Sequence, residues 1–440
     1  MDNNKIYFVI DLKTFYASVE CATRGLDPFT TNLIVADPSR GNGSICLAIT
    51  PAMKTLGIKN RCRVFEIPKN VAYIVAKPRM KLYIEYAAKI YAIYLRYISP
   101  EDIHPYSIDE MFIDATTYLK LYKTDANKFA KFLMKKIYDE LHITATCGIG
   151  TNLYLAKIAL DISAKHKKDN IAYLDEEKYI KELGNHQPLS DFWMISTGYM
   201  TRLNRLGLYT MNDIAKFDEK KLYKEFGINA EILIDHSKGI EPVEMKHIKA
   251  YKRKSNSISQ SQILFRDYTF EEAKIIVKEM VEILCLDLVD KGLVSNQIGL
   301  SVGYSKEGYK TTGGSKKLSV RTNVYSAFID EFLDIYERTT NNDKMIRRIG
   351  IGFNNVVGIE YEQYDLFTDV DKIKKEQRID AVINNLKEKY GKNSILKGMN
   401  FEDSATARER NKLIGGHNGG EDESIWSCQN IFTLRCFKRL

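Results

Sequence analysis

Three acidic residues stand where short apolar runs end, and their chemistry suits a bound cation. Asp11 closes the apolar run KIYFVIDL (5–12), and about a hundred residues later PYSIDEMFID (105–114) sets Asp109 beside Glu110. Neighbours in a strand point to opposite faces, so one carboxylate should face the core unless the backbone turns. Two carboxylates about 4 Å apart repel by roughly 4 kcal/mol at an effective dielectric near 20, and a multivalent cation turns this repulsion into attraction. The pair taken alone is explained more simply by a solvated acidic turn.

The elements expected around these acids favour an α+β sheet. A helix-like stretch follows Asp11, a helix over 79–98 leads into the hairpin that holds Asp109, and a helix over 124–141 precedes the strand ITATCGIG and the helix NLYLAKIALDISAK. This order suits a sheet covered by helices on one face. Asp11 should then lie on a strand next to the one that carries Asp109 and Glu110.

Length and composition limit the class of protein. A chain of 440 residues is too long for one core and predicts three or four domains. Its hydrophobic content of 44% is typical of a globular protein, and no run of about 18 apolar residues predicts a membrane span. The first residues lack the cleavage site of a signal peptide, so we expect a cytoplasmic protein.

Cysteines and net charge say little about ligands. The seven cysteines are odd in number and form no CxxC pair, which argues against a zinc site and a disulfide framework. A net charge of +8 only hints at a polyanionic partner.

Four ordered motifs carry a family resemblance. DLKTFYASVE, YSIDEMFID, GIGTNLYLAKIALDISAK and RRIGIGF together resemble a Y-family translesion DNA polymerase, over about residues 5 to 415. The stretch YGKNSILKGMNFEDSATARERNKLIGGH resembles the UmuC-like branch of Gram-positive bacteria and their mobile elements. The resemblance implies a multidomain α+β fold shaped as a right hand. It assigns residues 1–15 and 79–172 to the palm, 16–78 to the fingers, 173–240 to a helical thumb, 241–254 to a linker, 255–358 to a little finger, and 359–440 to a C-terminal tail.

The resemblance also implies a reaction. Such enzymes add deoxynucleotides to a primer 3′ end with two Mg²⁺ ions, here opposite damaged template during DNA repair and the SOS response. By resemblance Asp11 and Asp109 bridge both ions, Glu110 holds the ion at the primer end, and the Leu12 carbonyl completes the second site. The adjacent acids are then tolerated because metal and substrate share them.

Nucleotide contacts follow from the same motifs. Tyr16 resembles the ring that blocks a ribose 2′-hydroxyl, whereas Phe15 is expected in the core. Lys165 matches the lysine that reaches the triphosphate, and Lys54 falls where many members have arginine. Either lysine could instead belong to a solvated helix face. Pro51 stands where several relatives carry a phosphate-contacting tyrosine.

DNA contacts are expected along the chain after the palm. The thumb keeps only Gly198 of the usual Gly-x-Gly loop, so it departs from the family pattern that binds DNA phosphates there. Basic residues of the linker and little finger could follow a duplex backbone without reading its sequence. The residues expected to do so are Lys252, Arg253, Lys254, Lys316 and Lys317.

A peptide after the little finger resembles the bacterial clamp-binding motif. Gln363, Leu366 and Phe367 form a Q-x-x-L-F pattern in a polar segment, and this predicts binding to the sliding clamp, the β subunit of the replicative polymerase. A short strand closing the last domain is the alternative. The sequence leaves open whether a UmuD-like partner is needed.

The sequence leaves two other functional classes open. A DNA-binding scaffold with an idle metal site, recruited to the clamp, is the alternative function. A two-metal nuclease is a third, but it has no use for a sugar-blocking ring.

Overall fold

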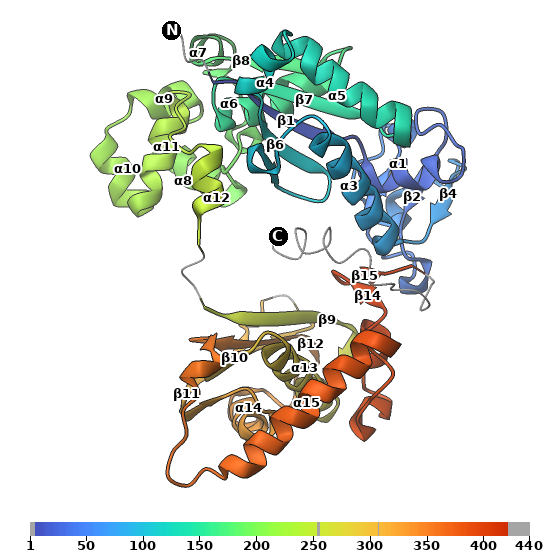
Figure 1. Ribbon diagram of the computed structural model, residues 1–440, viewed down its shortest axis with the longest axis vertical. Helices are drawn as coiled ribbons and strands as arrows, with labels where there is room; N and C mark the ends of the chain where they lie inside the picture. The colour runs from blue at the N-terminus through green and yellow to red at the C-terminus, as the bar shows by residue number, and fades with distance from the viewer. Residues whose placement is uncertain (1–4, 253–255, 307, 421–440) are drawn as a thin grey trace. The chain divides into compact units, whose positions relative to one another are not determined.

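The computed structural model describes residues 5–252, 256–306 and 308–420, which form two compact units (Figure 1). Unit 1 ends at Tyr251, and unit 2 begins at Lys252. Arg253 and Lys254, two of the expected DNA contacts, lie outside the described residues.

A five-stranded sheet in the order β5-β6-β1-β7-β8 forms the centre of unit 1. Its middle strand, β1, pairs antiparallel with β6 and β7, and β8 runs parallel to β7. The strands are β1 (Tyr7–Leu12), β5 (Ile103–Pro105), β6 (Glu110–Asp114), β7 (Ala145–Gly150) and β8 (Ile171–Leu174).

Helices cover both faces of this sheet, although the sequence order predicted one. Phe8 of β1 contacts Phe129 of α5, with ring centroids 6.0 Å apart. Val9, whose side chain points to the other face, lies in a cluster with Ala156 of α6. The helices of this region are α3 (Met80–Leu95), α4 (Thr116–Leu121), α5 (Ala126–Leu141) and α6 (Leu153–Ile158).

Two glycines let α6 lie directly on the sheet. A Cβ atom on Gly148 would stand 2.0 Å from the Ala156 carbonyl oxygen, and one on Gly150 would stand 2.2 Å from the Ala156 nitrogen. Both distances are too short for any side chain. The close contact fixes the lysines of α6 and of the turns after it relative to the strand ends.

A second, three-stranded sheet lies in the region expected as fingers. Its order is β3-β2-β4, and an apolar cluster around Ile34, Ile49 and Met53 forms its core. The elements are α1 (Phe15–Ala22), β2 (Leu33–Val35), β3 (Ala48–Ile49), α2 (Pro51–Thr55) and β4 (Ile74–Ala76).

Short helices follow, as predicted for a thumb, and they share an apolar core around Tyr179, Phe192 and Leu203. They are α7 (Glu176–Leu183), α8 (Thr197–Arg205), α9 (Met211–Lys216), α10 (Glu219–Phe226) and α11 (Ala230–Ser237).

The segment predicted as a linker contains a helix, α12 (Met245–Ala250). Met245 is buried with Val9 and Phe112, and the Lys249 ammonium donates to the carbonyls of Pro100 at 2.7 Å and Ile103 at 2.6 Å. Residues to 250 are therefore anchored on unit 1. Lys249 is thereby engaged within unit 1.

Unit 2 is built on a sheet in the order β11-β10-β12-β9, with α13 and α14 packed on one face. Buried side chains from both helices and from β9, β10 and β12 form its core, including Met280, Phe328 and Phe353, and the partly buried Leu318 of β11 packs against it. The elements are β9 (Ile258–Tyr268), α13 (Phe270–Asp290), β10 (Leu293–Tyr304), β11 (Thr312–Thr322), α14 (Tyr325–Thr339), β12 (Ile346–Asn354) and β13 (Val357–Gly358).

The described part of the predicted tail is largely folded. Helix α15 buries Ile373, and Asn400 and Thr406 donate hydrogen bonds to buried Glu279 of α13. The elements are α15 (Val370–Tyr390), α16 (Ala407–Arg410), β14 (Leu413–Ile414) and β15 (His417–Asn418). The polar sequence of this segment predicted a C-terminal tail. The segment is folded all the same, because polar contacts rather than apolar ones hold it on unit 2.

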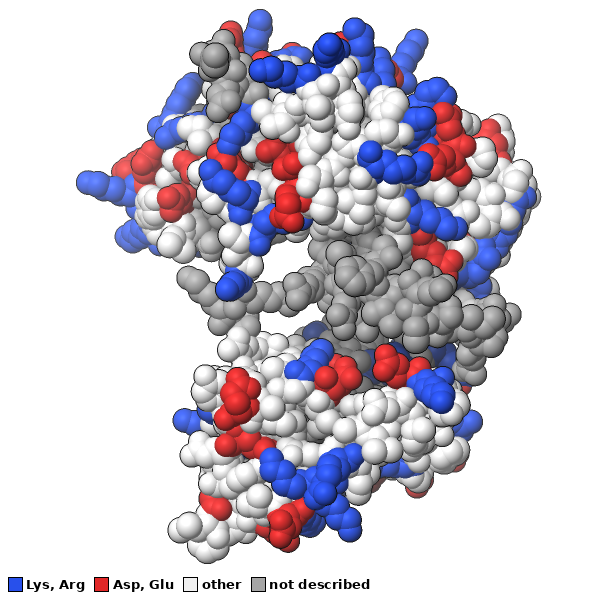
Figure 2. Space-filling view, in the orientation of Figure 1, with Lys and Arg blue, Asp and Glu red and all other residues white. Residues whose placement is uncertain are grey.

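Charge is mixed over the surface. Figure 2 shows lysines and arginines of both units interspersed with acids on the face drawn there, without one continuous basic stripe. In the described ranges, no helix is long and apolar enough to cross a membrane.

Candidate active site

The three acids singled out in the sequence have neighbouring backbone positions at the ends of the inner strands β1 and β6 of the unit 1 sheet. Asp11 lies directly opposite Glu110 in the antiparallel register of β1 and β6. Opposite residues in such a pair point to the same face. The Leu12 N–H donates to the Asp109 carbonyl at 2.9 Å, which holds the third acid beside the end of β1.

In a straight strand one of the two adjacent acids would face the core. Here the backbone turns at Asp109, which removes this conflict. Strand β6 begins at Glu110, and the Glu110 carbonyl accepts the N–H groups of Tyr106 at 2.9 Å and Ser107 at 3.2 Å. The Ser107 hydroxyl donates to the Asp109 carboxylate at 2.6 Å. Asp109 therefore lies in the hairpin turn, outside the strand alternation that would have sent it to the opposite face.

Glu110 shares the interior with a buried lysine. Its Oε1 lies 2.7 Å from Nζ of Lys157 on α6, and the two side chains are only 11% and 8% exposed. Burial raises the pKa of Glu110 to about 7, against the opposing effect of Lys157. Burial alone would lower the pKa of Lys157, but Glu110 and Asp161 raise it above its ordinary value. The lysine therefore stays charged and partly neutralises the acid.

Asp11 is also buried near positive charge. Burial raises its pKa to about 6, Lys165 opposes this shift, and the nearby Asp109 adds to it. Nζ of Lys165 lies 3.6 Å from the Asp11 carboxylate and 2.9 Å from that of Asp161. The predicted triphosphate lysine thus lies at the acidic site.

Two more lysines lie within electrostatic range of Asp11. Partial desolvation lowers the pKa of Lys54, and Asp11 acts in the opposite direction. Lys13 responds in the same way, and its ammonium donates to the Asn170 side chain. Lys13, Lys54 and Lys165 therefore form a basic group beside the acids, which is suited to a polyphosphate.

Tyr16 lies in the first turn of α1, close in sequence to the end of β1 that carries Asp11. Thr14 adopts a left-handed backbone (φ 46°) that reverses the chain after β1, and Phe15 is buried as expected. Burial and the nearby Asp109 carboxylate raise the pKa of the half-buried Tyr16. Its ring stacks on Tyr83 of α3, with centroids 4.6 Å apart. Tyr16 therefore lies beside the acids rather than in the core.

The structure adds residues that the sequence reading missed. Lys157 and Asp161 connect Glu110 with Lys165 through contacts of 2.7 to 3.0 Å. Their spacing was a usable signal, because residues four apart lie on one helix face. Lys157, Asp161 and Lys165 repeat at that interval.

The donor set suits Mg²⁺ in kind. Carboxylates and a backbone carbonyl are the oxygen ligands that Mg²⁺ prefers. The raised pKa values of Asp11 and Glu110 show buried acids whose negative charge lacks full compensation. Within the described ranges no three His, Cys, Asp or Glu side chains form a ready cluster for a metal ion. Residues that fit the metal are present, and Lys157 now occupies one of the Glu110 oxygens.

In unit 2, the two expected β11 lysines point in different directions. Nζ of Lys316 contacts Glu331 of α14, and Lys317 lies opposite Gln297 on the face of the sheet away from the helices. Lys252 is exposed at the start of the unit. Only Lys317 of the pair therefore lies on the open face.

That open face is nearly smooth at its centre. Its residues alternate with core residues such as Leu300 and Ile351. Two neighbouring rows across the sheet contain only glycine and serine: Ser259, Gly352, Gly299 and Ser315, then Ser261, Gly350, Ser301 and Gly313. Small side chains let a bulky partner approach the backbone closely.

The predicted clamp peptide is exposed at its apolar end. Leu366 is 99% and Phe367 95% exposed. Gln363 forms two backbone hydrogen bonds with Arg321 of β11, of 2.8 and 3.0 Å, and Asp365 accepts from the Ser319 hydroxyl at 2.8 Å. The peptide is thus attached to unit 2 at its base and presents its two apolar side chains to solvent.

Comparisons with known proteins place these features in a family. The impB/mucB/samB family matches residues 10–161, and its C-terminal domain matches residues 255–366. The first range contains all three acids. The UV-damage repair protein UvrX of Bacillus subtilis (strain 168) is 33% identical to this chain, over 93% of this chain and 96% of the UvrX chain. DNA polymerase IV 2 of the same strain is 30% identical over 95% of this chain and 100% of its own.

A solved structure agrees in fold. The Y-family DNA polymerase chimera of Dbh and Dpo4 superposes with a TM-score of 0.61, at 20% identity, over 80% of this chain and 99% of its own. The architecture is therefore that of a right-hand polymerase with palm, fingers, thumb and little finger. The chain belongs to the impB/mucB/samB family and is a Y-family DNA polymerase, as its motifs predicted.

Proposed function

We propose that this polymerase adds deoxynucleotides to a primer 3′ end opposite damaged template, in DNA repair and the SOS response, with two Mg²⁺ ions. The observation that carries the proposal is the meeting of Asp11, Asp109 and Glu110 beside a group of lysines. Because template DNA and deoxynucleotides are found in the cytoplasm, we expect the enzyme to act there.

The acidic residues and the lysines of the site have different proposed roles. Asp11, Asp109, Glu110 and the Leu12 carbonyl would hold the metal ions, which when bound activate the primer hydroxyl and neutralise phosphate charge. Lys165, with Lys54 and Lys13, binds the triphosphate.

Primer extension tests the proposal. Wild-type protein with Mg²⁺ and deoxynucleotides should extend a templated primer, and Asp109→Ala should abolish extension while retaining DNA binding. An idle scaffold would bind the same DNA without extension, and a nuclease would shorten the primer. Comparable extension by Asp109→Ala would refute the assignment.

Tyr16 is proposed as the sugar gate. Tyr16 opens the helix that follows Asp11 and Leu12, and its hydroxyl is within electrostatic range of Asp109, so the incoming sugar should pass near it if the acids hold the triphosphate metal. Tyr16→Ala should raise ribonucleotide insertion far more than it lowers deoxynucleotide insertion. Measuring kcat/KM for both sugars checks this, and an unchanged ratio would assign Tyr16 a packing role.

The open face of unit 2 is proposed as a nonspecific DNA surface. Its glycine and serine rows permit close approach, and Lys317 and exposed Arg348 lie on the same face. Contacts of this kind bind phosphates without reading bases. This suits an enzyme that meets lesions in any sequence.

Leu366 and Phe367 are proposed to bind a pocket of the sliding clamp. Burying both could contribute roughly 1.5 to 3 kcal/mol each, and with directional hydrogen bonds from Gln363 this suits a weak tether near the micromolar range, about 8 kcal/mol in total. The double variant Leu366→Ala, Phe367→Ala should lose stimulation by the clamp but keep short, distributive extension. Equal loss of both would mean that the peptide is structural. The sequence leaves open whether a UmuD-like partner is also needed.

A further inference from the structure

A joint between α1 and α3 lies directly behind the proposed sugar gate. Tyr16 and Glu20 are four residues apart on α1, and Arg79 and Tyr83 are four apart at the start of α3. Residues at this spacing lie on one helix face. The two faces meet in pairs, with Tyr16 on Tyr83 and Glu20 between Tyr83 and Arg79.

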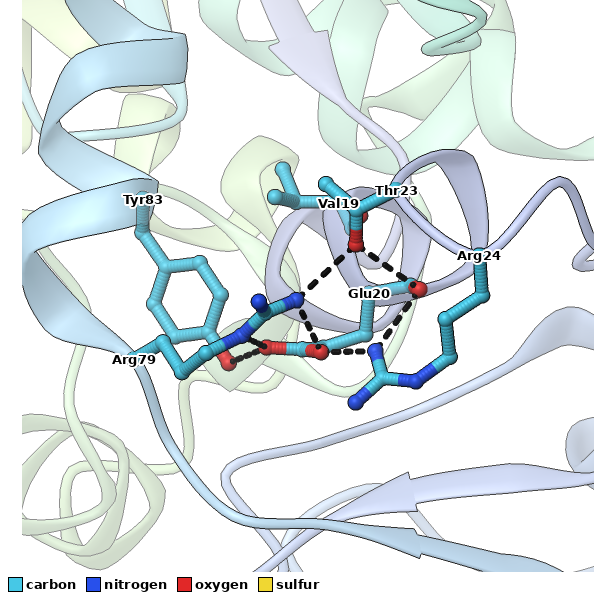
Figure 3. Close-up of polar contacts among 6 residues, drawn as sticks. All are labelled: Val19, Glu20, Thr23, Arg24, Arg79 and Tyr83. Carbon is cyan, nitrogen blue, oxygen red and sulfur yellow. Dashed lines mark hydrogen bonds and ion pairs between the residues drawn. The ribbon is translucent and has the colours of Figure 1, made fainter. Parts of the chain in front are cut away.

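Glu20 is the fixed centre of this joint (Figure 3). Its side chain is 0% exposed, and Arg79 donates to both carboxylate oxygens, at 3.0 and 2.8 Å. Arg24 adds an ion pair, and the Tyr83 hydroxyl donates at 2.7 Å. These bonds hold the pKa of Glu20 below its ordinary value although burial would raise it. These donors restrain the Glu20 carboxylate to the position in which all of them can reach it.

Tyr83 transmits that position to the gate. It is 0% exposed, its hydroxyl is held by Glu20, and its ring stacks on Tyr16 at an interplanar angle of 29°. A stacked ring loses contact area when its neighbour tilts, so Tyr83 restricts where the Tyr16 ring can lie. Exclusion of a hydroxyl depends on such placement, because the outcome at a reacting centre is sensitive to displacements of about 1 Å.

We propose that Glu20 and Tyr83 are positioning residues for sugar selection: anchored by Arg79, they hold Tyr16 where it excludes the 2′-hydroxyl. The inference rests on the proposed role of Tyr16. The buried ion pair of Glu20 and Arg79 would then control which nucleotide is accepted, although it does not contact the reacting atoms. Neither residue is proposed to contact the metal ions or the triphosphate.

The test compares insertion of one deoxynucleotide and its ribonucleotide. Tyr83→Leu, which removes the stack, and Glu20→Gln, which weakens the anchor, should each lower the ratio of deoxy to ribo kcat/KM by about tenfold. Tyr83→Phe removes only one hydroxyl, so it should fold normally and give a smaller loss of selectivity. A rise in ribonucleotide insertion, rather than a fall in both, separates a positioning role from general damage.

A double variant makes the test decisive. In a Tyr16→Ala background, Tyr83→Leu should change the ratio no further, because residues acting through one group are non-additive. Tyr118→Phe is the matched control, since it removes a tyrosine hydroxyl that donates to Asp102 at 2.6 Å elsewhere in unit 1. It should leave selectivity unchanged.

The outcomes separate the two proposals. If Tyr16→Ala changes the ratio while Tyr83→Leu, Tyr83→Phe and Glu20→Gln do not, the positioning role is overturned and the gate stands. If Tyr16→Ala itself has no effect, both are overturned, and extension dependent on Asp109 still tests the polymerase.

Discussion

Two buried glutamates, one in each unit, show how differently a protein can treat the same group. Glu279 of α13 is 1% exposed and accepts hydrogen bonds from the Asn400 amide and the Thr406 N–H, both at 2.8 Å, and from the Ala407 N–H at 3.1 Å. Glu110, 8% exposed as a whole residue, faces one ammonium, with two further acids, Asp11 and Asp161, close by. Fixed neutral donors satisfy Glu279, whereas Glu110 lacks full compensation.

The difference separates structure from function. A carboxylate surrounded by backbone and amide donors holds two segments together and needs no ligand. A carboxylate with a raised pKa among like charges is typical of sites that bind cations or move protons. The first glutamate should therefore govern stability, and the second group should govern chemistry.

The largest expected effect is the loss of chemistry at the acidic site. Asp11→Asn keeps the shape of the side chain but removes the charge, so extension should fall by about a thousandfold or more. Its unfolding midpoint should not fall, because burial already disfavours the charged form of Asp11. Rapid-quench extension and thermal unfolding check the two halves. A large loss of stability with only a modest loss of activity would show that Asp11 has a structural role and not a catalytic one.

The converse effect is expected at Glu279. In Glu279→Gln one amide NH₂ must face backbone N–H donors, so the free energy of unfolding of unit 2 should fall by about 3 kcal/mol. Turnover of the folded fraction should stay unchanged. Denaturant titration measures the loss, and Glu388→Gln, on the exposed face of α15, is the control that should change stability little. Equal changes in the free energy of unfolding for Glu279→Gln and Glu388→Gln would contradict the structural role of Glu279.

A smaller effect should link Lys157 to the metal. Lys157 and Mg²⁺ both neutralise Glu110, so Lys157→Met should unfold more easily without metal and gain more from it. The rise in unfolding midpoint on adding Mg²⁺ should therefore exceed the rise seen in wild type. Lys135→Met, which breaks an exposed pair with Asp139, serves as the control. An unchanged response to Mg²⁺ would show that Lys157 does not substitute for the ion.

The smallest effect distinguishes the two lysines of β11. Lys317→Ala should lower the salt dependence of DNA binding by about 0.9 in slope, the amount for one lost phosphate contact. Lys316→Ala should leave the slope nearly unchanged, because Glu331 already pairs with that ammonium. Binding isotherms at several salt concentrations measure both. The same slope change for both variants would show that the ion pair does not restrain Lys316.

Much of the site could be read from the sequence because its signals are local. Apolar runs that stop at acids predicted strand ends at Asp11 and Glu110, and the register places the two opposite each other. Polar neighbours predicted exposure of Leu366 and Phe367, and both are almost fully exposed. In each case nearby residues decide the outcome, by alternation or by the lack of apolar partners.

Tertiary structure decided what depends on residues far apart in the chain. The sequence could not tell that Lys316 turns to Glu331 while Lys317 faces outward, or that Lys249 anchors α12 on the Pro100 carbonyl. Nor could it show that Tyr83 lies behind Tyr16, since the two are brought together only where α1 meets α3. A lysine or tyrosine has the same intrinsic preferences in each setting. Its partner is set by the packing of whole elements, a property that no short stretch of sequence contains.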